Sequence, residues 1–219
     1  MVQRPLYHLA EDWMILVFTA SLLILTWGKL RSFTRFSRTF SAAVNIRIMR
    51  QVAREETSLV RHHLLQTLVF VALSSLIIYL ILAYYQITIP YLSGALLWVS
   101  LCLAMAMVYF GKTGVIAIVR HLAGGDFGLE EYQFNVFLVL RIFGVVLLPA
   151  AVLMAYLPVQ WFPMALISIA ILAASAFLFR LGRGVVNSLR LGISPFYIFF
   201  YICTLEILPL LVVYRALQS

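Results

Sequence analysis

Long apolar runs constrain this chain more than any other feature of its sequence. A transmembrane helix needs about 20 mainly apolar residues, and six runs approach that length. The apolar residues are continuous, whereas the strands of an outer-membrane barrel would alternate apolar and polar positions. The sequence therefore predicts an all-α, polytopic membrane protein. Its single integral membrane domain would hold six transmembrane helices, over residues 13–28, 64–89, 91–111, 133–157, 162–181 and 195–217.

The composition supports a membrane protein. Of the 219 residues, 64% are hydrophobic and only 11% are charged, which is too little charge to cover the surface of a soluble domain. The net charge of +8 fits cytoplasmic loops facing anionic lipid headgroups, and we expect no nucleic-acid partner. Cys102 and Cys203 both lie inside apolar runs, without the Cys/His spacing of a metal site. We therefore expect no disulfide, metal or cofactor.

Basic residues gather in alternate connections, after the first, third and fifth runs, and only Arg4 and Arg215 fall on the other side. The positive-inside rule then makes these three connections cytoplasmic and both termini periplasmic. Glu11 and Asp12 precede the first run, so we expect an uncleaved anchor and no signal peptide. Several aromatic residues fall where an outer aromatic belt would lie: Trp13, Tyr84, Tyr85, Tyr91, Tyr156, Trp161 and Tyr214.

Two groups of arginines border the cytoplasmic side. Arg47, Arg50 and Arg54 recur at helical spacing within the connection 29–63, which predicts an interfacial amphipathic helix. This helix would either hold the first two spans against anionic lipid or dock a cytoplasmic partner or phosphate headgroup. Before the last run, a basic rim acts as a topology signal or holds a lipid phosphate; it consists of Arg180, Arg183 and Arg190.

Two charged residues lie inside predicted spans. Glu206 lies roughly 16 Å from the cytoplasmic start of its helix, and Arg141 lies roughly 11 to 12 Å from the start of its own. Each would cost about 2.5 to 3.5 kcal/mol or more if it stood alone near the centre of a membrane helix. We therefore predict that Arg141 and Glu206 pair in the interior of the bundle.

Neighbouring residues would open a small polar cavity around this pair. Pro209 and Pro149 each remove one backbone hydrogen bond from their helices, and Gly144 permits close approach of another backbone. Further polar atoms near Glu206 come from Tyr201, Cys203 and Thr204. Two interpretations stay open: a structural ion pair that fixes helix register, or a site for an anionic headgroup, a small solute or a proton.

No catalytic pattern accompanies these charges. The sequence shows no nucleophile–base pair, phosphate-binding loop or metal-ligand spacing. Adjacent residues on a helix point about 100° apart, so His62 and His63 cannot easily share one ion. We therefore expect that the protein is not an enzyme and has no catalytic residue.

The closing stretch from Phe196 to Leu210 resembles the end of an uncharacterised bacterial family, domain of unknown function 4271. The pattern Tyr-x-Cys-Thr-x-Glu-x-x-Pro at Tyr201 to Pro209 carries the resemblance, which covers roughly residues 130–219. It implies a helical bundle in the inner membrane of a bacterial envelope, and it implies no particular activity.

Two functions fit these observations. The first is a non-enzymatic subunit or assembly factor of an envelope complex, because the chain is small, its outer turns are tight and it lacks an enzyme motif. The second is a carrier or binder of a small anionic or lipid-phosphate substrate, with Arg141 as the anion contact and Glu206 as the proton or charge partner.

Overall fold

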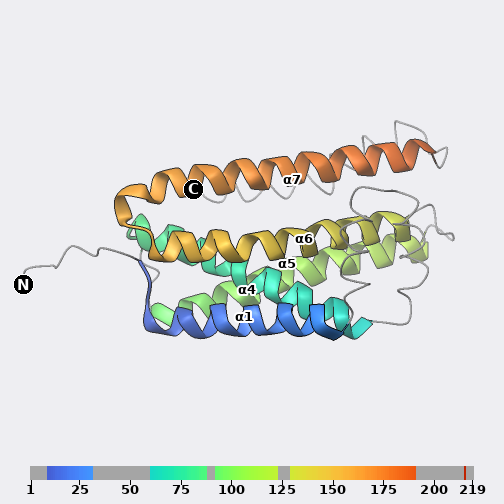
Figure 1. The fold of residues 1–219 in the computed structure, drawn as a ribbon. Helices are drawn as coiled ribbons and strands as arrows, with labels where there is room; N and C mark the ends of the chain where they lie inside the picture. The colour runs from blue at the N-terminus through green and yellow to red at the C-terminus, as the bar shows by residue number, and fades with distance from the viewer. Residues whose placement is uncertain (1–8, 32–59, 88–91, 123–128, 191–214, 216–219) are drawn as a thin grey trace, which may run out of the picture.

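The structure is a computed structural model, and it describes residues 9–31, 60–87, 92–122, 129–190 and 215. Within these ranges the chain is all-α, without strands. Five long helices lie lengthwise beside one another (Figure 1). They are α1 (Asp12–Arg31), α4 (Val60–Tyr84), α5 (Gly94–Leu122), α6 (Leu129–Tyr156) and α7 (Phe162–Arg190), and a short 3-10 helix, η1 (Val159–Trp161), precedes α7.

Four helices are long and apolar enough to cross a membrane, where the sequence predicts six spans. These segments are Asp12–Leu30, Leu65–Tyr84, Gly94–Gly111 and Val159–Phe179. The predicted span 133–157 corresponds to α6, whose apolar part, Ile142–Tyr156, is shorter and follows Arg141 directly. The predicted span 195–217 lies outside the described residues, except for Arg215, and so does most of the amphipathic connection 29–63.

The helix ends follow from local backbone chemistry. At the end of α4, Ile87 N donates to Leu82 O at 3.0 Å and Gln86 N donates to Ala83 O at 3.2 Å. Gln86 has a φ of 54°. This is a Schellman motif with Gln86 in the left-handed position, and it ends the helix at Tyr84 although the sequence predicts a span to residue 89.

The connection from α6 to α7 is a tight turn, in agreement with the short turn predicted between Pro158 and Pro163. Pro158 directly precedes η1, and its carbonyl accepts a hydrogen bond from Trp161 N at 2.9 Å. Pro163 lies in the first turn of α7, where a missing backbone N–H costs nothing. The C-terminal end of α7 runs past the predicted boundary at 181, so Arg180, Arg183 and Arg190 lie on the helix itself.

Helix α4 is the centre of the bundle. It contacts α1, α5 and α6, whereas α7 packs mainly on α6. In its apolar segment 44% of the residues are buried, compared with 11% in α1 and 6% in each of the segments Gly94–Gly111 and Val159–Phe179. Helices α1, α5 and α7 therefore leave most residues of their apolar segments at least partly exposed.

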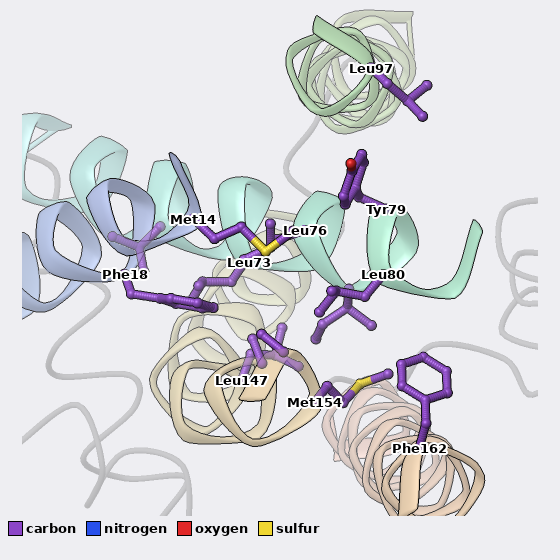
Figure 2. Packing of buried hydrophobic residues seen from close by; sticks show 14 residues of the cluster. Met14, Phe18, Leu73, Leu76, Tyr79, Leu80, Leu97, Leu147, Met154 and Phe162 are labelled. Carbon is purple, nitrogen blue, oxygen red and sulfur yellow. The ribbon is translucent and has the colours of Figure 1, made fainter. Parts of the chain in front are cut away.

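The core fills the half of the bundle near the α6–α7 turn. Figure 2 shows Leu73, Leu76 and Leu80 of α4 packed between the side chains of α1 and α6. Leu80, Met154 and Phe162 lie together at the end of this cluster (Figure 2). The buried polar side chains of the described bundle are two serines, Ser21 and Ser75.

Candidate functional site

The predicted pair of Arg141 and Glu206 stays a prediction. Arg141 belongs to α6, but the structure describes only its backbone. Glu206 lies outside the described residues, together with Tyr201, Cys203, Thr204 and Pro209, and so do Arg47, Arg50 and Arg54. The structure does describe residues of α4, α5 and α6 near the backbone of Arg141.

Gly144 lies where α6 comes closest to α4. A Cβ atom built on Gly144 would lie 3.2 Å from Cβ and 3.4 Å from Cα of Phe70. Gly144 is buried, and the rings of Phe70 and Phe143 lie beside each other with centroids 6.5 Å apart. The absence of a side chain at this position therefore brings the two helices together. Pro149, further along α6, is exposed on its surface.

The contact between Gly144 and Phe70 fixes the level of Arg141. Helices α4 and α6 run in the same direction, because α5 returns between them (Figure 1). Thr67 precedes Phe70 by three residues, and Arg141 precedes Gly144 by the same number. Both steps are about 4.5 Å along the axis. The backbone of Arg141 is therefore level with that of Thr67.

Thr67 makes a polar contact across helices at this level. Its Oγ1 lies 3.4 Å from the Tyr109 hydroxyl of α5, and either group can donate the hydrogen. Helix α5 also contacts α6. Thr67 follows His63 by four residues, about 6 Å along α4. The contact between Thr67 and Tyr109 therefore lies near the start of α4.

A second polar group, at the opposite end of the bundle, joins α1 to α4. The Tyr79 hydroxyl of α4 donates to Glu11 Oε1 at 2.5 Å, and Trp13 Nε1 donates to Glu11 Oε2 at 2.5 Å. The rings of Trp13 and Tyr79 are nearly perpendicular, with centroids 5.4 Å apart. We call these three residues the Glu11 clasp.

Helix α5 completes this end of the bundle. Gly94, its first residue, has a φ of +55°, and a Cβ atom there would lie 3.6 Å from Glu11 Oε2. Trp98 packs on Trp13 with centroids 5.5 Å apart and donates from Nε1 to Ala72 O at 3.2 Å. From the sequence alone, we expect Glu11 only to mark the start of an uncleaved anchor. Its partner lies 68 residues away along the chain, and no local pattern links the two.

We expect the Glu11 clasp to contribute stability through coupled hydrogen bonds. Tyr79→Phe and Glu11→Gln should each lower the free energy of unfolding, and the double variant should lose less than the sum. A coupling energy of about 1 to 2 kcal/mol fits a partly exposed hydrogen bond to a carboxylate. SDS unfolding of the four proteins measures it. Thr19→Val is a control, because Thr19 Oγ1 bonds to the carbonyl of Ile15 in its own helix; strictly additive losses would exclude the coupling.

The described helices bring no group of three His, Cys, Asp or Glu side chains together that could hold a metal ion. The described helices instead carry two separate polar groups, one at each end of the apolar core.

Comparison with known proteins supplies a family and no activity. The family model described as "Domain of unknown function (DUF4271)" matches residues 14–217, a longer range than the resemblance of the closing stretch. No curated protein and no solved structure matches the chain. Since the family model spans almost the whole sequence, the chain belongs to the DUF4271 family.

Proposed function

We propose that this protein is a non-enzymatic subunit or accessory factor of a protein complex in the bacterial inner membrane. It would cross the membrane six times, with both termini periplasmic, and use its helix faces to contact partner proteins. Four apolar helices and the family match support membrane association and are compatible with this role.

The apolar core of the bundle is the observation that most favours this role over transport. Met14, Leu73, Leu76 and Leu80 are all completely buried, and Met154 is nearly so. A carrier needs a polar route through its centre, but these side chains fill the half of the bundle near the α6–α7 turn. By contrast, Leu103 and Met107 of α5 are exposed and could pack on another membrane protein.

Site-specific photo-crosslinking in living cells tests this proposal. A photoreactive residue at Leu103 or Met107 of α5, or at Leu16 of α1, should give a protein adduct of defined size. The same residue at buried Leu76 is the matched control and should give none. Lipid adducts alone at all three exposed positions would contradict a role in a complex.

A second candidate function is the binding of an anionic or lipid-phosphate substrate by Arg141 and Glu206. The position of Arg141 in α6, directly before the apolar segment Ile142–Tyr156, favours it, because arginine is the side chain best suited to bind a phosphate through charge-assisted hydrogen bonds. In this function Glu206→Gln should abolish complementation of a deletion strain while the abundance of the protein stays normal. Loss of the protein itself would instead indicate a structural pair.

A further inference from the structure

One face of α7 carries a small residue at every seventh position. Ser168, Ser175 and Gly182 are all exposed. The two hydroxyls donate to carbonyls of their own helix, Met164 O and Leu172 O, so each serine acts as a small side chain that needs no polar partner. A Cβ atom built on Gly182 would meet no heavy atom within 4 Å beyond its chain neighbours and the nearby backbone of its own helix.

Large apolar side chains alternate with these small residues. Ile171 and Leu178 follow the two serines by three residues each, and they are 64% and 66% exposed. Steps of three and four residues that repeat every seven place a single stripe along a helix, as in helices that pack on another helix at a shallow angle. Small residues in such a stripe let two membrane helices approach closely. We call this set the α7 stripe; it consists of Ser168, Ile171, Ser175, Leu178 and Gly182.

The chain that follows α7 is close enough to cover the α7 stripe. Only four residues, 191–194, separate the end of α7 at Arg190 from the predicted span 195–217. Connections this short join antiparallel helices that lie side by side. Among the described helices, α7 packs mainly on α6, and the exposure of the stripe shows that α6 leaves it free. The stripe is therefore the face of α7 best suited to receive the following helix.

The predicted span carries a matching pattern. When it returns antiparallel, with its first residue level with the last residue of α7, Leu210 comes level with Ser175. Large side chains of the span would then face the small positions of α7. Arg215, the described residue of this span, is helical and exposed, and it lies about 100° around a helix from Tyr214. The span has its own apolar stripe at steps of four and three residues: Cys203, Ile207, Leu210, Tyr214 and Leu217.

We propose that the C-terminal segment 195–217 packs as an antiparallel helix on the α7 stripe. Helix α6 and this segment would hold α7 from two sides, so the exposed faces of α1 and α5 would be left for partner proteins. The inference goes beyond the proposed function and does not depend on it, because both candidate functions are compatible with this packing.

Disulfide mapping in the full-length protein tests this docking. In native membranes, with Cys102 and Cys203 replaced by serine, Ser175→Cys is combined in turn with a cysteine at each position from 206 to 214. A protease site placed in 191–194 reveals the linked chains, because their two fragments stay joined after cleavage. Oxidation should link Ser175→Cys best to position 210, less well to 207 and 214, and about tenfold less to the positions between them.

Ala173→Cys is the matched control. Ala173 is exposed and lies only two residues from Ser175, but nearly on the opposite side of the helix from the α7 stripe. It should link to none of the positions from 206 to 214. Because serine and alanine differ little from cysteine in size, both variants should fold as the wild type does.

Three results would overturn the proposal. Linkage from Ala173→Cys as strong as that from Ser175→Cys would place the segment elsewhere on α7. A link between two chains through Ser175→Cys, without one inside the chain, would assign the stripe to a second copy. No link from any pair would leave the stripe to lipid. Photo-crosslinking from Leu103 is read separately, so failure of this docking would not be confused with failure of the proposed function.

Discussion

Replacing Gly144 by leucine should strongly destabilise the bundle. Even the first carbon of a side chain at this position would lie 3.2 Å from Cβ and 3.4 Å from Cα of Phe70, and the second of these atoms belongs to the backbone of α4. The remaining leucine carbons would force α6 away from α4, and these two helices share the most extensive contact among the described helices. We expect a loss of about 3 kcal/mol or more in the free energy of unfolding.

Resistance to SDS unfolding and the yield of monodisperse protein measure this effect. Gly144→Ala should cost less, about 1 kcal/mol, because Phe70 needs to shift by only a few tenths of an ångström. Gly114→Leu is the matched control, since a Cβ atom there would meet no heavy atom within 4 Å beyond its chain neighbours and the nearby backbone of its own helix. Equal stability of Gly144→Leu and Gly114→Leu would show that α6 does not approach α4 at this point.

Phe162→Ala should loosen α7 from the rest of the protein. Phe162 is 1% exposed and stacks on Tyr84 with centroids 4.3 Å apart and an angle of 15° between the rings. It also packs near Met154 and Leu80 (Figure 2). In lipid, the loss of a buried ring is mainly a loss of packing, and we expect a cost of about 3 kcal/mol.

Proteolysis between α6 and α7 reports this loosening directly. In Phe162→Ala the turn around η1 should be cut faster than in the wild type. Met164→Ala, two residues further along the same helix, is the control, because Met164 is 63% exposed and should have almost no effect. A wild-type rate of cleavage in Phe162→Ala would show that α7 is held elsewhere.

A feature of this fold is predictable from the sequence when nearby residues determine it. Apolar runs and prolines act locally, so the helices and the turn at Pro158 are predictable from the chain alone. The end of α4 is a local feature as well, but Gln86 in a left-handed conformation has no sequence signal as clear as a glycine.

The central position of α4 could not be predicted. Its apolar run resembles the others, and in a membrane a buried helix and a lipid-facing helix have similar composition. Gly144 suggests close approach, but nothing in the sequence names Phe70 as its neighbour. The bond between Tyr79 and Glu11 could not be predicted either, because it joins α4 to a residue just before α1, 68 positions away in the chain.

The level of Arg141 shows the limit of counting along one helix. Counted from the start of the predicted span 133–157, Arg141 would lie well inside the membrane. Measured against α4, it is level with Thr67, only about 6 Å beyond His63. Helices of unequal apolar length share one membrane, so a depth becomes meaningful only when neighbouring helices are aligned.

Cysteine cross-linking between α4 and α6 is the most direct test of this alignment. Thr67→Cys and Arg141→Cys are combined in a background with Cys102 and Cys203 replaced by serine. A short bifunctional thiol reagent should join the two positions, whereas Thr67→Cys with Val152→Cys, three turns away along α6, should stay unlinked. Efficient linkage of the second pair and none of the first would contradict the placement of Arg141 beside Thr67.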